Sequence, residues 1–407
     1  MTTKTTARLA WILVVGMIIS VGCGGPQDVS KQQVKAQWDQ SRATMLYSVA
    51  SEHLRVGQLD QAFIKTREAL ALAPEFHPAS ILLGKVLIEQ GNYADAITVL
   101  ATVCEKLPQA AEPVYLLGVA QEKMRQYDSA LVSYRKAYML DNSRLDAVNA
   151  AAEVLMLTDR VEAAKSLIDD TIARAGNEPA MYETAGRIAM MRQDYVAAER
   201  YFQDAHDLDF NNVRYRELLG EAQFLSGDYA EAVQTFTHLL AIKDYRAGAT
   251  TYAMLGDSFM AVGRHVDARN AYLKSTEVNP NSSGAWVNLA QASLALGDDE
   301  RAMRSARSAL SIDANNVDAT LVLGYAMLRN GKLTDATEIL SKAVARHGDH
   351  VQLQLVLGRC HQLAGKTELA QACYNKALAI EPDNLLAREL LRTTSESETQ
   401  RIVIIHN

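Results

Sequence analysis

Small residues recur along this chain at a fixed spacing. Alanine stands at ten positions separated by a constant step, and only the step from Ala232 to Ala268 is longer, by two positions. The ten positions are Ala62, Ala96, Ala130, Ala164, Ala198, Ala232, Ala268, Ala302, Ala336 and Ala370. A constant period of about 34 residues is typical of a chain built from one repeated supersecondary unit.

A second small position precedes each of these alanines by twelve residues and is always Gly or Ala. Large apolar residues flank both small positions at helical spacing, which predicts two amphipathic helices of about 13 residues in each repeat. Helices whose axes approach within about 8 Å tolerate only small residues where they cross. The second set consists of Ala50, Gly84, Gly118, Ala152, Gly186, Gly220, Gly256, Ala290, Gly324 and Gly358. In seven repeats a glycine stands five residues before the periodic alanine, as expected for a helix C-cap and turn.

These spacings resemble the tetratricopeptide repeat, whose unit of about 34 residues has small residues at its eighth and twentieth positions. Ten repeats run over residues 43–384, which is most of the chain. The resemblance implies an all-α, right-handed α-solenoid of about ten helix-turn-helix repeats. We expect a capping helix over residues 385–392 and a C-terminal tail over 393–407, in which Ile402–Ile405 is a β-branched run that could form a partner-binding strand, pack back or stay loose. The two extra residues fall in Lys243–Gly248, where we expect a lengthened turn and a hinge.

The N-terminus has the pattern of an export signal. Lys4 and Arg8 precede an apolar run of eleven residues, which is shorter than the roughly 20 residues that a spanning helix needs. The residues directly before Cys23 look like a bacterial lipobox, although Ser20 stands where that family prefers Leu. We therefore expect a signal peptide over 1–22, a diacylated Cys23, and a tether with a lead-in helix over 23–42. A spanning helix and a secreted chain stay open as alternatives.

Composition narrows the function classes. The chain has 407 residues, 48% of them hydrophobic, and 41 basic against 48 acidic residues give a net charge of −7. This balance argues against a nucleic-acid-binding protein, which usually has a basic face. Of the three other cysteines, Cys360 and Cys373 fall on predicted adjacent helices, so a disulfide is an alternative to the buried free thiols that we favour.

Candidate chemistry is sparse. The only close histidine pair is His347 and His350, whose spacing in a turn lacks the i, i+4 arrangement of zinc hydrolases. Nothing in the sequence matches a phosphate-binding loop, a nucleophile elbow or a Cys/His dyad. We therefore expect no enzyme activity, no metal and no cofactor.

The family resemblance places a binding groove on the first helices, at the second, fifth, ninth, twelfth and thirteenth positions of each repeat. The twelfth position is apolar in eight of the ten repeats, which suits either an adaptable peptide-binding stripe or packing. These eight residues are Leu54, Ile88, Met156, Met190, Phe224, Met260, Leu294 and Leu328. Charged groove candidates in the central repeats are Glu183, Arg187, Glu217, Glu221 and Asp257.

Together these features predict a non-enzymatic protein-protein interaction scaffold of the bacterial cell envelope. It would be held by lipid at Cys23 on the periplasmic side, with the outer membrane favoured over the inner. Its partners would be envelope proteins or peptide segments, similar to those of repeat lipoproteins that assist secretion, pilus or polysaccharide-export machines. The alternative is an accessory protein that binds a glycan or another non-protein polymer in the groove. The partner, the pathway and the oligomeric state do not follow from the sequence.

Overall fold

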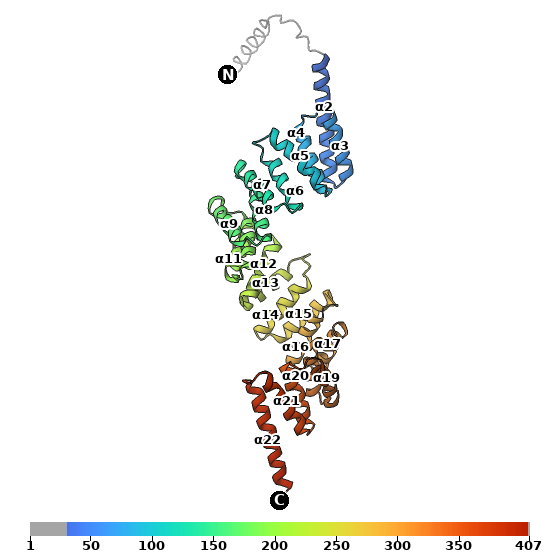
Figure 1. Ribbon diagram of the computed structural model, residues 1–407, viewed down its shortest axis with the longest axis vertical. Helices are drawn as coiled ribbons and strands as arrows, with labels where there is room; N and C mark the ends of the chain where they lie inside the picture. Colours follow the sequence, from blue (N-terminus) through green and yellow to red (C-terminus); the bar gives the residue numbers. More distant parts are fainter. Residues whose placement is uncertain (1–30, 406–407) are drawn as a thin grey trace, which may run out of the picture. The chain divides into compact units, whose positions relative to one another are not determined.

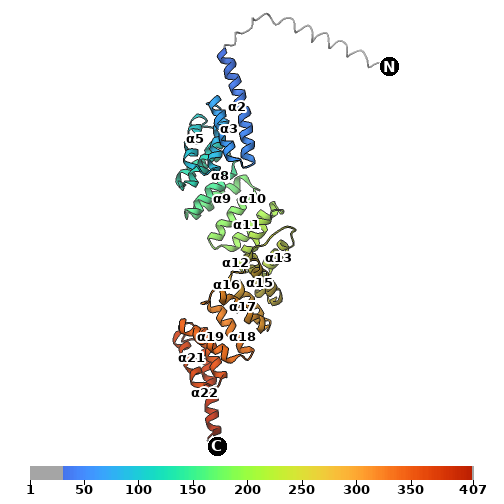
Figure 2. The same cartoon turned by 90° about the vertical axis from the view of Figure 1, so that its right-hand side faces the viewer.

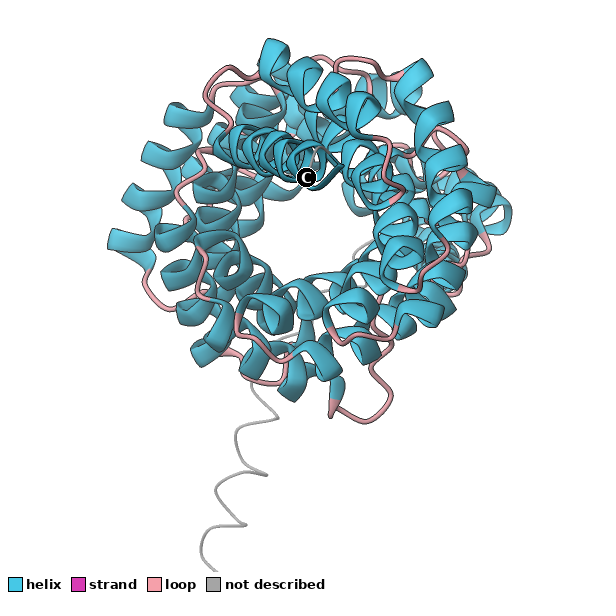
Figure 3. Cartoon of the chain, turned by 90° about the horizontal axis from the view of Figure 1, so that it is seen from below, coloured by secondary structure: helices cyan, strands magenta, loops and turns pink. Residues whose placement is uncertain are grey.

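The computed structural model describes residues 31–405 (Figure 1). The expected signal peptide over 1–22 and the lipidated Cys23 lie outside the described residues. Within residues 31–405 the chain forms 21 helices, and Figure 3 shows only helices and connecting loops there. The all-α prediction is therefore confirmed. None of the helices in this range is both long enough and apolar enough to cross a membrane.

The first of two compact modules ends at Arg160. Its consecutive helices are joined by short turns and pack in sequential order. They are α2 (Lys31–Arg55), α3 (Leu59–Leu72), α4 (His77–Glu89), α5 (Tyr93–Lys106), α6 (Ala111–Lys123), α7 (Tyr127–Leu140) and α8 (Leu145–Leu157). We call this part the N-terminal module.

The C-terminal module begins at Val161 and repeats the same alternation of helices. Its helices are α9 (Val161–Ala175), α10 (Pro179–Met191), α11 (Tyr195–Leu208), α12 (Val213–Ser226), α13 (Tyr229–Leu240), α14 (Ala249–Ala261), α15 (His265–Val278), α16 (Ser283–Ala295), α17 (Asp299–Ile312), α18 (Val317–Arg329), α19 (Leu333–Arg346), α20 (Val351–Leu363), α21 (Thr367–Ile380) and α22 (Leu385–Ile405). The helix boundaries follow the period of the alanines, and the one longer step falls between α13 and α14.

Close approach of helices explains the small residues. All ten of the periodic alanines are fully buried. A Cβ atom built on Gly220 would lie 2.7 Å from Cε1 of Phe236, and one on Gly256 would lie 2.5 Å from Cε1 of Tyr272. The large side chain of each second helix thus lies directly on the glycine of the first helix. A larger residue at these glycines would displace the ring and separate the helices.

The turn after the first helix of a repeat needs a residue in the left-handed backbone conformation, with positive φ. Gly91 has φ +78° and Gly263 has φ +77°. Asp159 replaces the glycine in the fourth repeat and still adopts φ +59°. The turn is therefore kept in that repeat, at the steric cost that a side chain has in this region.

The lengthened turn between α13 and α14 is fastened to its own module. Tyr245 is partly buried there, and its hydroxyl donates to Glu217 on α12 at 2.9 Å. Asp244 beside it has φ +69°. The two inserted residues thus allow an aromatic side chain to fold back against the first helices.

The C-terminal helix is longer than the sequence predicted. The capping helix was expected to end at Arg392, but α22 continues to Ile405, so the Ile402–Ile405 run is helical and not a strand. A Ser or Thr inside a helix can satisfy its hydroxyl by donating to the carbonyl four residues earlier. Thr394 does this, donating to the carbonyl oxygen of Leu390 at 2.7 Å, and its side chain is buried.

Candidate functional site

A cleft of about 520 Å³ opens on the first helices of the N-terminal module. Three successive first helices, α2, α4 and α6, contribute to it, because the fixed period of the repeats brings equivalent positions side by side. The apolar lining comes from Leu54, Leu59, Ile88, Tyr115, Leu116 and Val119, and Lys85 and Glu89 add one charge of each sign. The cleft therefore combines a mainly apolar wall with a charged edge, as ligand-binding clefts do.

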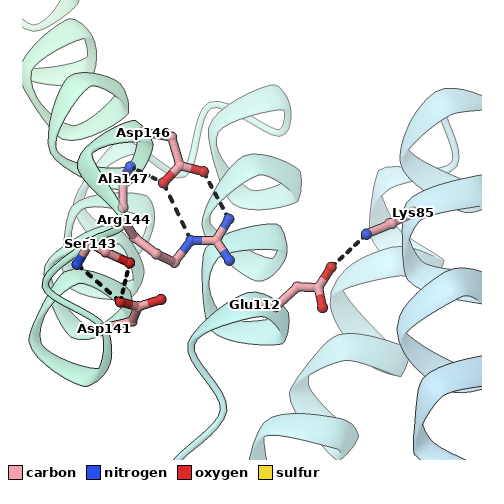
Figure 4. A network of polar contacts seen from close by, with 7 residues as sticks. All are labelled: Lys85, Glu112, Asp141, Ser143, Arg144, Asp146 and Ala147. Atoms are coloured by element: carbon pink, nitrogen blue, oxygen red, sulfur yellow. Dashed lines mark hydrogen bonds and ion pairs between the residues drawn. The ribbon is translucent and has the colours of Figure 1, made fainter. Parts of the chain in front are cut away.

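One ion pair joins two helices of this cleft, and a second pair lies next to it at the start of α8 (Figure 4). Lys85 on α4 contacts Glu112 on α6, with 2.5 Å between Nζ and Oε1. Arg144 forms a two-point contact with Asp146, at 3.3 Å from Nε to Oδ1 and 2.8 Å from Nη2 to Oδ2. These pairs are solvent-accessible, so each contributes about 1 kcal/mol or less to stability, and they act chiefly by fixing side-chain positions.

Tyr115 is the aromatic side chain of the cleft. The guanidinium carbon of Arg144 lies 4.5 Å from the centre of its ring, and the ring of Tyr134 lies 5.7 Å away at a tilt. Burial raises the pKa of Tyr115, with the nearby Asp146 adding to the effect. The phenol is therefore a neutral, oriented hydrogen-bonding group at the cleft wall.

The sequence reasoning missed this polar network. Glu112, Tyr115 and Lys85 occupy the second, fifth and ninth repeat positions, which are the positions that the family resemblance assigned to the groove. The charged candidates were taken only from the central repeats. The same groove positions in the N-terminal repeats would have identified these residues.

In the C-terminal module the predicted acidic residues serve partly as internal acceptors. Glu183 pairs with Arg214 at 2.8 Å. Glu217 accepts from the hydroxyls of Tyr245 and Thr251, at 2.9 and 3.3 Å. Asp257 accepts from the Tyr272 hydroxyl at 2.5 Å. Glu183 and Glu217 thus link neighbouring repeats, Asp257 links the two helices of its own repeat, and the availability of all three carboxylates to a ligand is reduced.

Burial changes the ionisation of two of the acidic groove candidates. It raises the pKa of Glu221, and the neighbouring Glu217 carboxylate raises it further. Burial also raises the pKa of Asp257, while the hydrogen bond from Tyr272 opposes that shift. Both carboxylates therefore cost stability when they are ionised in the folded protein.

Glu221→Gln should raise the melting temperature at pH 7. Because the folded-state pKa of Glu221 lies above its ordinary value of 4.5, the wild type loses stability as the pH rises from that value through the folded-state pKa. The variant escapes this loss, so its advantage should be absent near pH 3.5 and should grow as the pH rises above 4.5. Thermal unfolding followed by circular dichroism between pH 3.5 and pH 7 measures it. Glu231→Gln, at an exposed position on α13, is the matched control, and an equal gain there would contradict the assignment.

The apolar twelfth positions lie mostly within the packing between repeats. Seven of the eight residues are half-buried, and Met156 is only 8% exposed. Met156 was predicted in the groove, and little of its side chain reaches the surface, so its role in binding stays a prediction. Phe224 and Met260 pack against the same buried cluster as Phe236 and Tyr272. Only part of the area of these eight side chains therefore lies at the protein surface.

The two polar exceptions at the twelfth position have a structural cause. Glu122 accepts a hydrogen bond from the Tyr134 hydroxyl at 2.7 Å, and Gln362 accepts one from the Tyr374 hydroxyl at 3.1 Å. Both tyrosine rings are buried against the glycine of the first helix. In these two repeats the buried tyrosine on the second helix thus has its acceptor twelve residues earlier, whereas Tyr272, at the same repeat position, donates to Asp257 fifteen residues earlier.

The remaining candidates for chemistry do not assemble into a site. Among residues 31–405 no group of three or more His, Cys, Asp or Glu side chains is placed to hold a metal ion, which includes His347 and His350. Cys104, Cys360 and Cys373 are free thiols in this structure. Burial raises the pKa of Cys360 to about 11, so this thiol is protonated at neutral pH and unreactive.

Family models match most of the chain. A model described as the Cilia and flagella-associated protein 70 C-terminal domain matches residues 155–401, and two tetratricopeptide repeat models match residues 53–118 and 111–144. A repeat-containing protein of Methanocaldococcus jannaschii, MJ1428, is 22% identical over 265 residues, which are 60% of this chain and 46% of that protein. Superkiller complex protein 3 of Mus musculus is 25% identical over 277 residues, 56% of this chain and 18% of that protein. The chain thus spans less than half the length of these relatives.

Solved structures of low identity also align with the chain. The anaphase-promoting complex hetero-tetramer Cut9-Hcn1 aligns with 90% of this chain and 99% of its own, at 14% identity and a TM-score of 0.42. A tetratricopeptide repeat protein from Parabacteroides merdae aligns with 62% of this chain and 99% of its own, at 14% identity and a TM-score of 0.44. The repeat pattern, the helix pairs and the family models lead to one conclusion. The chain belongs to the tetratricopeptide repeat proteins, and residues 155–401 belong to the family described as the Cilia and flagella-associated protein 70 C-terminal domain.

Proposed function

We propose that this protein is a non-enzymatic scaffold of the bacterial cell envelope that binds extended segments of partner proteins along its first helices. Tetratricopeptide repeat proteins generally mediate protein-protein interactions. The observation that carries the finer proposal is the cleft lined by α2, α4 and α6. Its row of apolar side chains suits the side chains of an extended segment.

The chemistry of the cleft favours a peptide over a glycan. Sugar binding usually relies on several exposed aromatic faces, and the cleft lining contains one aromatic residue, Tyr115, whose ring is already covered by Arg144. Leu54, Ile88 and Val119 instead present aliphatic surface. An aliphatic or aromatic peptide side chain would gain about 25 cal/mol for each Å² of apolar surface that it buries there.

The role in the envelope follows from the N-terminal sequence pattern. A lipid on Cys23 would hold the N-terminal module close to a membrane, because only seven residues separate Cys23 from α2. In this position the scaffold would assist assembly of a secretion, pilus or polysaccharide-export machine. The proposed location is the periplasmic face of the outer membrane.

Site-specific crosslinking tests the cleft. The photoreactive residue benzoyl-phenylalanine is placed at Val119 in the cleft and, as the matched control, at the exposed Val132 on α7. Irradiation of intact cells should yield discrete protein adducts from Val119 and markedly fewer from Val132, and mass spectrometry of the adducts identifies the partner. Equal adducts at both positions, adducts with glycan only, or no adduct at Val119 would overturn the cleft proposal.

The anchor is tested separately. Cys23→Ser should abolish incorporation of labelled palmitate and move the protein from the membrane fraction to the soluble fraction. A membrane-bound, unlabelled wild type would exclude the lipid anchor and leave the cleft proposal standing.

A further inference from the structure

A second hollow continues the cleft of the N-terminal module. It has a volume of about 740 Å³ and lies at the two turns that join α2 to α3 and α4 to α5. Gly57, Leu59 and Glu89 line both the cleft and this hollow, so one continuous surface runs from the apolar wall to the turns. α2 and α3 lie side by side in Figures 1 and 2, and Gly57 stands in the turn between them. We call the second hollow the turn hollow.

The turn hollow differs from the cleft in its chemistry. Apart from Gly57 and Leu59 its lining is polar, and none of the described residues that form it is Lys or Arg. Side-chain amides both donate and accept hydrogen bonds, so they suit the N–H and C=O groups of an extended main chain. Four amide side chains and two carboxylates make up the polar lining, namely Gln58, Gln61, Gln90, Asn92, Asp60 and Glu89.

Existing contacts decide which charge a ligand meets at the turn hollow. Lys85 in the cleft lining is joined to Glu112 on α6, so its charge is already compensated. Asp60 accepts from the side-chain amide of Gln90 at 3.2 Å, and this neutral donor leaves the carboxylate charge in place. Glu89 is exposed, and its carboxylate forms no ion pair or hydrogen bond within the described part of the chain. The turn hollow therefore presents two negative charges without a cation beside them.

The cations of the neighbouring segments lie elsewhere. Arg55 at the end of α2 contacts Glu52, with 2.6 Å between Nη2 and Oε1. Lys123 and Arg125, at the end of α6 and in the turn after it, line neither the cleft nor the turn hollow. Salt screens exposed charges beyond about 10 Å, so the charges that line the hollow act most strongly on a ligand there. A positive group is the one that they attract.

We propose that the partner segment carries a Lys or Arg two or four residues from the apolar side chain that enters the cleft, with the basic group at Asp60 and Glu89 in the turn hollow. The inference rests on the proposed cleft function and names the chemistry of the partner. In an extended segment, residues two apart point to the same side and lie about 7 Å from each other. One side chain of such a segment enters the cleft, and the next on the same side reaches the turn hollow. Charges of this kind select among partners more than they add affinity.

The sequence of the captured segment tests the inference first. Benzoyl-phenylalanine at Val119 of the full chain, irradiated in intact cells, should give an adduct whose partner peptide is identified by mass spectrometry. We expect a Lys or Arg two or four residues from an apolar residue at the crosslink. Failure to form any adduct would contradict the proposed function, whereas an adduct whose segment has no basic residue there would contradict this inference alone.

Charge reversal is the second and stricter test. Glu89→Lys should lower the yield of the Val119 adduct severalfold, and replacing the partner's basic residue by Glu should restore it, because opposite charges meet again. Glu105→Lys is the matched control, since Glu105 is exposed on α5 and lines neither hollow. It should leave the yield unchanged, and circular dichroism should show that both variants are folded.

Three results of the charge reversal would overturn the inference and leave the cleft proposal standing. They are an adduct yield that Glu89→Lys does not change, an equal loss in Glu105→Lys, and a loss in Glu89→Lys that the partner's reversal does not restore.

Discussion

Phe202→Ala is expected to lower the free energy of unfolding of the C-terminal module by about 3–5 kcal/mol. Phe202 on α11 is fully buried, and its ring lies against Gly186 on α10 in the space that a Cβ atom would otherwise occupy. Removal of the ring leaves a cavity between two helices whose backbones are already close, so the site cannot collapse fully. For a module of this size the melting temperature should fall by about 10 °C, measured by circular dichroism or calorimetry.

Phe210→Ala is the matched control for this experiment. Phe210 lies in the turn before α12 of the same module and is 67% exposed. Its removal should change the melting temperature by less than about 1 °C, since substitutions at exposed positions usually cost below about 0.5 kcal/mol. Equal effects of the two substitutions would contradict the packing of the Phe202 ring on Gly186.

Ala232→Trp should destabilise the same module by overpacking. Ala232 on α13 is fully buried and belongs to the cluster that contains Phe236 and Tyr272. An indole at this position must displace a neighbouring side chain or helix, which costs about 1–3 kcal/mol and more where the surroundings cannot move. The expected result is a melting temperature lower by several degrees, together with a broader transition because the disruption is local in a repeat array.

Ala230→Trp provides the control for the register. Ala230 lies on the same helix two residues earlier and is exposed, so the added indole meets solvent. It should leave the melting curve nearly unchanged. If Ala230→Trp were the more destabilising substitution, the assignment of the periodic alanines to helix crossings would be wrong.

The repeat architecture could be predicted from the sequence because its cause is local and repeated. A small residue where two helices cross and a large one opposite it are constraints within one repeat, as in Gly220 and Phe236. Their recurrence makes the signal far stronger than any single motif. Glycine at a left-handed turn, as in Gly91, is a constraint of the same kind.

The C-terminal end could not be predicted to the same degree. Ser and Thr favour the end of a helix in isolation, and the β-branched run at Ile402–Ile405 favours a strand. In the structure the helix continues, with the Thr394 hydroxyl bonded back to Leu390 and its side chain packed. At Thr394, tertiary packing outweighs the intrinsic preference.

The candidate site, too, could be predicted only in part from the sequence. The sequence predicted which repeat positions belong to the first-helix surface, but it could not distinguish a side chain that packs between repeats from one that faces a cleft. Met156 and Leu54 are equivalent in sequence, yet Met156 is buried and Leu54 lines the cleft. That difference depends on the side chains of neighbouring repeats.

By itself, the sequence determined the helical class, the period and the small residues of this protein, because these follow from backbone geometry within a single repeat. Only the tertiary structure decided where a cleft opens, which carboxylates are consumed as internal acceptors, and that Trp38 and Met45 on α2 are left exposed. Tyr245 reaches Glu217 on the preceding first helix, and Lys85 reaches Glu112 on the following one. Such contacts depend on how successive repeats stack, and the free energy of each is too small to impose a pattern on the sequence.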